Sequence, residues 1–283
     1  MTHRMLSLRE AVCHSDNLAL AYARHARHRG LWMPGVPMSM VARAPVPPML
    51  ALAEELRGDR YRPHPPRIIP IAKADGGKRD ISVYMIRDRV AQRALVQVMQ
   101  QRTDAAMAPF SFGYRPARSV SMALASVRAY LDAGYCWVLD ADVEHCFDSI
   151  PHAPLLAEVE RRLGERAAPA LVSRYLSWNR ETRRTGVGIP QGSGLAPWLC
   201  NVYLWRLDDR VRSAGIPMVR YADDFVLLAR TREAIGQAQS LCAETLGAMR
   251  LRLHPLKTRI VEAAESFRFL GQRLGPAAGG TRP

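Results

Sequence analysis

Two adjacent acidic residues, Asp223 and Asp224, stand between two short apolar runs, 218–221 and 225–229. Apolar runs of this length around a short polar segment predict a β-hairpin. Its turn would concentrate negative charge, which is self-repulsive and which a divalent cation neutralises. Asp is also a common turn residue, because its side chain hydrogen-bonds the nearby backbone. The pair alone therefore leaves a purely structural role open.

A second acidic element lies upstream, in the apolar segment 135–143. It predicts a buried strand that carries Asp140 and Asp142 near its end and is followed by a helix beginning near Ala153. Two metal ions held about 3.5–4 Å apart need ligands that converge from separate elements. Unpaired buried carboxylates are costly, so arginine partners for these two acids are the structural alternative.

A glycine-punctuated loop, 188–197, lies between the two acidic elements and runs into the segment 198–207. The apolar spacing of that segment predicts a helix. Glycine allows the backbone to approach a ligand closely. An ordinary loop explains the glycines and prolines, but not their position between two acidic strands.

Six motifs follow one another along the chain: FGYRP at 112–116, ADV at 141–143 with FDSI at 147–150, GIPQG at 188–192, YADD at 221–224, HPLKT at 254–258 and FRFLG at 267–271. In this order and spacing they resemble prokaryotic reverse transcriptases of the group II intron-like type, and the resemblance runs from about Leu18 to Gly271. An ordered series is far more specific than any single motif. The resemblance implies an α+β fold with right-hand polymerase fingers and palm, in which helices back an antiparallel palm sheet.

The resemblance implies a site for two Mg²⁺ ions, with Mn²⁺ as a substitute. Its ligands would be Asp142, Asp223 and Asp224, with the carbonyl of Val143 as a further contact. Mg²⁺ prefers oxygen ligands and keeps several waters, so carboxylates and substrate phosphates suffice. In the implied reaction a primer 3′-hydroxyl attacks the α-phosphorus of a deoxynucleoside triphosphate, and the ions stabilise the attacking and leaving oxygens.

One aromatic residue is implied to select the sugar. In the family, the metal-binding acid precedes this aromatic by five residues, a spacing that Asp142 and Phe147 have and Asp140 lacks. Asp140 is therefore not expected to be a ligand. Phe147 would press against the position of a ribose 2′-hydroxyl, so that deoxynucleotides are preferred; a core phenylalanine is the alternative.

Lysine is rare among the 40 basic residues: only Lys73, Lys78 and Lys257 are present, all within the motif regions. The segment 69–80 resembles the fingers hairpin of the family, in which Arg79 and Lys73 would grip the incoming phosphates. Lys257 corresponds to a family lysine near the triphosphate. A lysine can act as proton donor to pyrophosphate, whereas arginine stays charged. A solvated lysine beside a helix end is the alternative.

Four further residues are implied to bind nucleic acid or nucleotide. Gln191 and Gly192 would pack against the templating base and incoming nucleotide, and Arg115 would contact the template. Tyr221 would lie near the primer terminus. An aromatic that fills the core is the alternative for Tyr221.

Composition favours a nucleic-acid partner without requiring one. The net charge of +14 and the pI near 10.2 suit a phosphate backbone, and they also suit an acidic protein or a membrane surface. We find no apolar run of about 18 residues and no signal-peptide segment, so we expect no membrane partner and a cytoplasmic, prokaryotic location. Five scattered cysteines without CxxC spacing predict reduced thiols.

We expect one catalytic unit with four segments. These are an N-terminal helical extension (1–66), fingers with the palm-entry segment (67–133), palm (134–274) and a flexible C-terminal tail (275–283). Within them we predict a helix through 86–95 and another from about Arg232 to Arg250, capped by Thr231. One departure from the family is Gly35–Met38, where relatives often carry GVDG; a template contact there is in doubt.

The expected activity is that of an RNA-directed DNA polymerase that uses an RNA template, a DNA or RNA primer and dNTPs. Twelve residues follow Gly271, so we expect the thumb to be largely absent. A partner protein, self-association or a structured RNA would then replace its clamp on the duplex. We favour a role in CRISPR spacer acquisition from RNA.

Other functions remain open. The enzyme could serve antiphage defence with a companion noncoding RNA, or it could be a template-independent or protein-primed nucleotidyl transferase with the same metal site. A non-catalytic RNA-binding relative is disfavoured, because a binding module has no use for clustered acids near phosphates. Pro190-Gln191-Gly192 differs from the Ser-Gln variant of diversity-generating retroelements, which disfavours that system.

Overall fold

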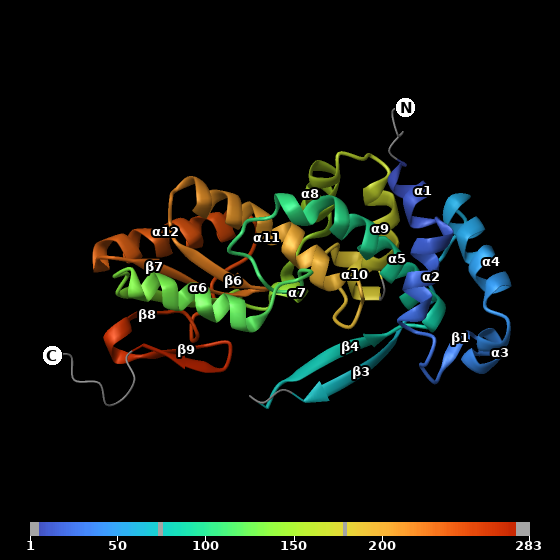
Figure 1. Ribbon diagram of the computed structural model, residues 1–283, viewed down its shortest axis with the longest axis horizontal. Helices are drawn as coiled ribbons and strands as arrows, with labels where there is room; N and C mark the ends of the chain where they lie inside the picture. The colour runs from blue at the N-terminus through green and yellow to red at the C-terminus, as the bar shows by residue number, and fades with distance from the viewer. Residues whose placement is uncertain (1–5, 73–75, 178–179, 276–283) are drawn as a thin grey trace. The chain divides into compact units, whose positions relative to one another are not determined.

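The computed structural model describes residues 6–72, 76–177 and 180–275. Helices and antiparallel strands are mixed along the chain (Figure 1) and form two compact units. The first unit combines 1–105 with 151–199, and the second combines 106–150 with 200–283. The predicted segment boundaries at 66, 133 and 274 stay predictions. Of the predicted tail, 276–283 lies outside the described residues.

The first unit is organised around α5 (Ile86–Thr103), which confirms the helix predicted through 86–95. Its buried face packs against α1 (Leu8–Val12) and α2 (Ser15–Ala23). Gln97 of α5 donates a 2.7 Å hydrogen bond to Asn17 Oδ1 of α2, which fixes the two helices side by side. The other helices of this unit are α3 (Met38–Arg43), α4 (Val46–Arg57), α8 (His152–Leu163), α9 (Ala168–Leu176) and α10 (Arg180–Thr185).

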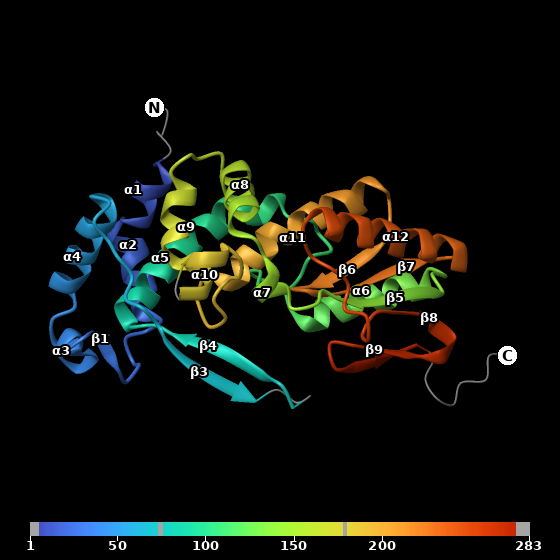
Figure 2. The same ribbon diagram turned by 180° about the vertical axis from the view of Figure 1, so that it is seen from behind.

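Two hairpins complete the first unit. The predicted hairpin of the 69–80 segment is confirmed: β3 (Arg67–Ala72) pairs antiparallel with β4 (Lys78–Val83), as Figures 1 and 2 show. A second hairpin, β1 (Leu31–Met33) with β2 (Val36–Pro37), interrupts the predicted helical extension. It forms because Gly35 adopts a φ of +76°, which glycine tolerates without steric cost.

The second unit contains a four-stranded antiparallel sheet in the order β6-β7-β5-β8. The predicted acidic hairpin is β6 (Met218–Tyr221) with β7 (Asp224–Ala229), and the predicted buried strand is β5 (Trp137–Asp142). β8 (Arg259–Glu262) pairs with β5 on the side away from β7. Both strand predictions made from the acidic motifs are thus confirmed.

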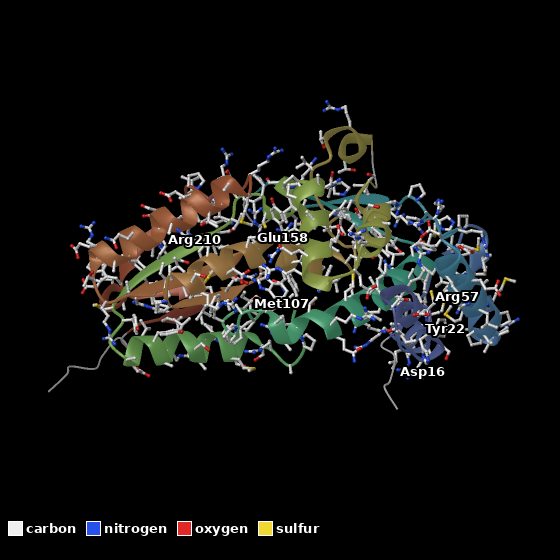
Figure 3. All side chains as sticks on the ribbon, turned by 90° about the horizontal axis from the view of Figure 1, so that it is seen from above. Asp16, Tyr22, Arg57, Met107, Glu158 and Arg210 are labelled. Carbon is white, nitrogen blue, oxygen red and sulfur yellow. The ribbon has the colours of Figure 1, made fainter. Side chains whose placement is uncertain are left out.

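Helices cover both faces of this sheet. In Figure 3 the strands lie between the green helix α6 (Val120–Asp132) and the orange α12 (Arg232–Ala248). Thr231 caps α12 as predicted, since its hydroxyl accepts a hydrogen bond from the amide of Ala234. One core cluster joins α6, the sheet and a small hairpin of β9 (Phe267–Phe269) and β10 (Gln272–Leu274). Its members are Phe112, Ala123, Leu124, Val127, Val138, Val219, Val226, Leu228, Phe267, Phe269 and Leu274.

The long helix α11 (Ala196–Ser213) confirms the helix predicted at 198–207. The remaining elements are short. The short ones are α7 (Cys146–Ser149), 3₁₀ turns at Asp104–Ala106 and Ala263–Glu265, β9 (Phe267–Phe269) and β10 (Gln272–Leu274). All five cysteines are free thiols, as expected. Among the described residues no helix is both long and apolar enough to cross a bilayer; the cytoplasmic location stays a prediction.

Candidate active site

The turn of the β6–β7 hairpin consists of Ala222 and Asp223, because Tyr221 pairs directly with Asp224. Ala222 has a φ of +62°, in the left-handed region that residues with a Cβ rarely occupy. The carbonyl of Asp223 accepts a 3.3 Å hydrogen bond from the amide of Val143. This bond ties the acidic turn to the residue that follows β5.

Two carboxylates lie side by side on the neighbouring strands β5 and β7. Asp142 at the end of β5 pairs in register with Asp224 at the start of β7. Side chains alternate along a strand, so Asp140 shares the face of Asp142. Burial raises the pKa of Asp224 to about 7, and the negative charges of Asp140, Asp142 and Asp223 add to this shift. A raised pKa with specific charged neighbours is a mark of a functional site.

Two cations neutralise part of this charge. Lys257 Nζ lies 2.6 Å from Asp142 Oδ2, and this hydrogen bond is the main reason that the pKa of Lys257 is raised. The turn that carries Lys257 is held in place by the amide of His254, which donates to the Asp142 carbonyl at 2.8 Å. Arg259 lies 3.1 Å from Asp140, so Asp140 has the arginine partner that the structural alternative required.

Asp140, Asp142 and Asp224 line a polar hollow of about 460 Å³, whereas Asp223 is not among its lining residues. Leu256, 90% exposed, stands at its edge. Among the described residues, no three or more His, Cys, Asp or Glu side chains are gathered closely enough to form a metal site as they stand. The acids of this site still fit Mg²⁺, because carboxylate oxygens are ligands that Mg²⁺ prefers. Their mutual repulsion, seen in the raised pKa of Asp224, is what a divalent cation would relieve. The hollow is lined by Asp140, Ala141, Asp142, Asp224, Leu256, Lys257, Arg259, Arg268, Leu270 and Gly271.

The residues after β5 lead directly into the predicted sugar-selecting aromatic. His145 adopts a φ of +46° and reverses the chain, and the short helix α7 follows at once. Phe147 in α7 is half-buried. Its predicted role stays a prediction.

Arg115 and Tyr221 have internal contacts. The buried guanidinium of Arg115 donates hydrogen bonds to the carbonyls of Ala108 and Ser111, at 2.7 and 2.9 Å. Tyr221 is half-buried and packs against the core cluster. The roles predicted for them, at the template and at the primer terminus, stay predictions.

Gln191 and Gly192, predicted to pack against the templating base, lie in the first unit, where a hydrogen bond joins their loop to β4. Ser82 donates its amide to the carbonyl of Gln191 at 2.7 Å. Gly192 has a φ of +95°, and a Cβ there would lie 2.6 Å from the Ser82 carbonyl oxygen, so only glycine fits. Arg79 is exposed on β4, while Lys73 lies outside the described residues.

The roles of three side chains near these motifs were not predicted from the sequence. Arg259 pairs with Asp140. Gln92 is fully buried, and its Oε1 accepts hydrogen bonds from Ser193 and Gly194, which fixes the loop after Gly192. Arg220 is buried beside the acidic turn. A signal for Arg220 was present, because a charged residue inside an otherwise apolar strand needs a partner.

Comparison with known proteins identifies the family. Residues 71–274 match the reverse transcriptase (RNA-dependent DNA polymerase) family. Protein YkfC of Escherichia coli K12 is 30% identical over 266 residues, covering 79% of this chain and 70% of YkfC. The group II intron-encoded protein LtrA of Lactococcus lactis is 28% identical over 162 residues, covering 56% of this chain and 27% of LtrA.

The fold is similar to a solved polymerase structure. A telomerase from Candida tropicalis, truncated from its C-terminal domain, superimposes with a TM-score of 0.58 at 13% identity, covering 74% of this chain and 53% of that one. The chain thus spans about a quarter of LtrA and about half of the telomerase chain. On the family match and the identity to YkfC, the chain belongs to the reverse transcriptases, the RNA-dependent DNA polymerases.

Proposed function

We propose that this chain extends a primer with deoxynucleotides along an RNA template, using Asp142, Asp223 and Asp224 as the acids of a two-metal site. The observation that carries the proposal is the pairing of Asp142 with Asp224 across the sheet, with Asp223 in the adjoining turn. Divalent ions bound there would supply activation of the primer hydroxyl and charge neutralisation on the triphosphate. No protein nucleophile is needed for such a transfer.

Lys257 and Phe147 have separate roles beside these acids. The ammonium of Lys257 carries a proton within reach of the acidic site, and its 58% exposed side chain is free to turn toward a leaving pyrophosphate. Phe147 would exclude a ribose 2′-hydroxyl and thereby select dNTPs. The carbonyl of Val143 is the proposed backbone contact.

The first unit would supply the fingers. Its exposed β3–β4 hairpin presents Arg79, whose planar guanidinium suits phosphate oxygens, and Lys73 belongs to the same hairpin by sequence. Gln191 and Gly192 would pack against the base pair being formed. Support for this role is the connection of their loop to β4, through the hydrogen bond from the Ser82 amide to the Gln191 carbonyl.

Single-nucleotide incorporation tests templated synthesis. Four RNA templates that differ only in the first unpaired base are each offered the four dNTPs one at a time, with Mg²⁺ and a labelled primer. Templated synthesis predicts addition of the complementary dNTP alone on each template. Equal addition irrespective of the template base would contradict the proposal and favour the template-independent transferase.

We also propose that the polymerase works with a partner, and that its system is CRISPR spacer acquisition from RNA. The sequence of the Gln191 loop supports this only by disfavouring diversity-generating retroelements. Defence with a companion noncoding RNA is the alternative. Sequencing of nucleic acids that copurify with the chain from its native host distinguishes them: newly acquired RNA-derived spacers support the first system, and one abundant structured RNA supports the second.

A further inference from the structure

Of the cations that the structure describes in the second unit, Arg220 is the most deeply buried, and it lies three residues before Asp223. Its side chain and that of its partner Asp208, on α11, are each 1% exposed. Two short hydrogen bonds join them, from Nε to Oδ1 at 2.7 Å and from Nη2 to Oδ2 at 2.5 Å. This bidentate geometry fixes the plane and the position of the guanidinium.

The remaining donor of Arg220 reaches the acidic turn itself. Nη1 donates to the carbonyl of Ala222 at 2.8 Å and to Oδ1 of Asn201 at 2.8 Å. Ala222 is the turn residue with a φ of +62°, a conformation that costs on the order of 1 kcal/mol or more and persists only when its surroundings hold it. Arg220 therefore stabilises the strained peptide that immediately precedes Asp223.

Asn201 extends the same network to the segment of the FGYRP motif. Its Nδ2 donates to the carbonyl of Gly113 at 2.8 Å. Gly113 in turn touches the acidic turn so closely that a Cβ on it would lie 2.4 Å from the amide nitrogen of Ala222. Asn201 and Asp208 are seven residues apart, two turns along α11, so one face of this helix carries both partners of Arg220.

We propose that Arg220, held by Asp208 and Asn201, is a positioning residue for the metal-binding acid Asp223. The network connects α11, the segment at Gly113 and the strained turn through one guanidinium. No described contact connects Arg220 with the polar hollow, so its effect passes through the Ala222 peptide. The inference rests on the proposed function, because it takes Asp223 as a metal ligand.

Lysine cannot replace this arginine. A lysine keeps the positive charge that Asp208 requires, but its single ammonium cannot hold two carboxylate oxygens, the Asn201 amide and the Ala222 carbonyl in a fixed plane. Arg220→Lys should therefore keep the fold while loosening the turn. Partners that orient metal ligands typically change metal affinity or activity about 10–100-fold when they are removed.

The test measures Mn²⁺ binding to the full chain without nucleic acid, by electron paramagnetic resonance, beside the thermal unfolding midpoint. The matched control is Arg212→Lys, which changes an exposed ion pair with Asp209 on the same helix α11. We expect Arg220→Lys to weaken Mn²⁺ binding about 10–100-fold with a folded protein, and the control to bind as the wild type does.

The outcomes separate the two proposals. If the wild type binds Mn²⁺ and folded Arg220→Lys binds it equally well, Arg220 is only a structural ion pair and the inference is overturned. If the wild type itself does not bind Mn²⁺, the proposed function fails first. Should Arg220→Lys not fold, Asn201→Ala carries the same test, since it removes the link between Arg220 and Gly113 but leaves the ion pair with Asp208.

Discussion

The ammonium of Lys257 lies 2.6 Å from a carboxylate oxygen of Asp142, one of the acids proposed to bind metal. If Asp142 is a metal ligand, Lys257 and the metal compete for the same carboxylate. Lys257→Met removes the competing charge, so we expect tighter Mn²⁺ binding by titration together with slower nucleotide incorporation, because the proton donor is lost. Weaker Mn²⁺ binding in Lys257→Met would contradict the competition.

Lys257→Arg separates proton donation from charge. Arginine keeps a cation beside Asp142, but its pKa is too high for ready proton release. We expect the variant to retain binding of the dNTP and to lose turnover at saturating substrate. Full turnover of Lys257→Arg would exclude Lys257 as the proton donor.

Asp224 makes the stability of the second unit depend on pH. Its pKa is raised to about 7 when folded and is about 3.9 in an unfolded chain, so between these values the folded protein binds more protons. The free energy of unfolding should therefore fall as the pH rises from about 4 to about 7 and level off above that. The measurement is urea unfolding without divalent ions across this range.

Asp224→Asn should remove this dependence. Each unit of pKa shift corresponds to about 1.4 kcal/mol. At pH 8 we therefore expect the free energy of unfolding of Asp224→Asn to exceed that of the wild type by more than about 1 kcal/mol. Near pH 4 this difference should disappear. Asp209→Asn, at an exposed ion pair, is the control and should show no such pH dependence. Equal stability of Asp224→Asn and wild type at pH 8 would contradict the raised pKa.

Gly113 should tolerate no side chain. An added Cβ would meet the backbone of Ala222, and overpacking of this kind typically costs about 1–3 kcal/mol. Gly113→Ala should therefore lower the unfolding midpoint and slow primer extension. Gly236→Ala in α12 is the matched control: nothing lies within 4 Å of its Cβ, and alanine in a helix stabilises by about 0.5–1 kcal/mol. If Gly113→Ala has the same unfolding midpoint and extension rate as Gly236→Ala, the prediction from the close contact at Gly113 is wrong.

Phe147 is expected to determine sugar selectivity. Phe147→Val opens the space where the ring would meet a 2′-hydroxyl, and a steric contact of this size is worth about 10–100-fold in discrimination. The ratio of kcat/KM for dNTP over NTP should fall by that factor, with dNTP incorporation largely retained. An unchanged ratio would assign Phe147 to the core.

Local patterns predicted the elements that carry the site more fully than the contacts between them. The short apolar runs around Asp140, Asp142 and Asp224 were sufficient to predict both acidic strands, because hydrophobic patterns and turn residues act locally. The pairing of Arg220 with Asp208 and Asn201 was not predicted. It joins a strand to a helix through side chains whose partners no sequence pattern specifies.

The most direct test of the metal-site assignment is the rate of primer extension on an RNA template with Mg²⁺, compared among the wild type, Asp142→Asn, Asp223→Asn and the surface control Asp209→Asn. Loss of a catalytic group commonly lowers turnover on the order of 10³-fold or more, so both site variants should be nearly inactive while folded, and the control should match the wild type. Turnover by folded Asp142→Asn or Asp223→Asn within about tenfold of the wild type would contradict the assignment of these acids as the metal-binding, catalytic centre.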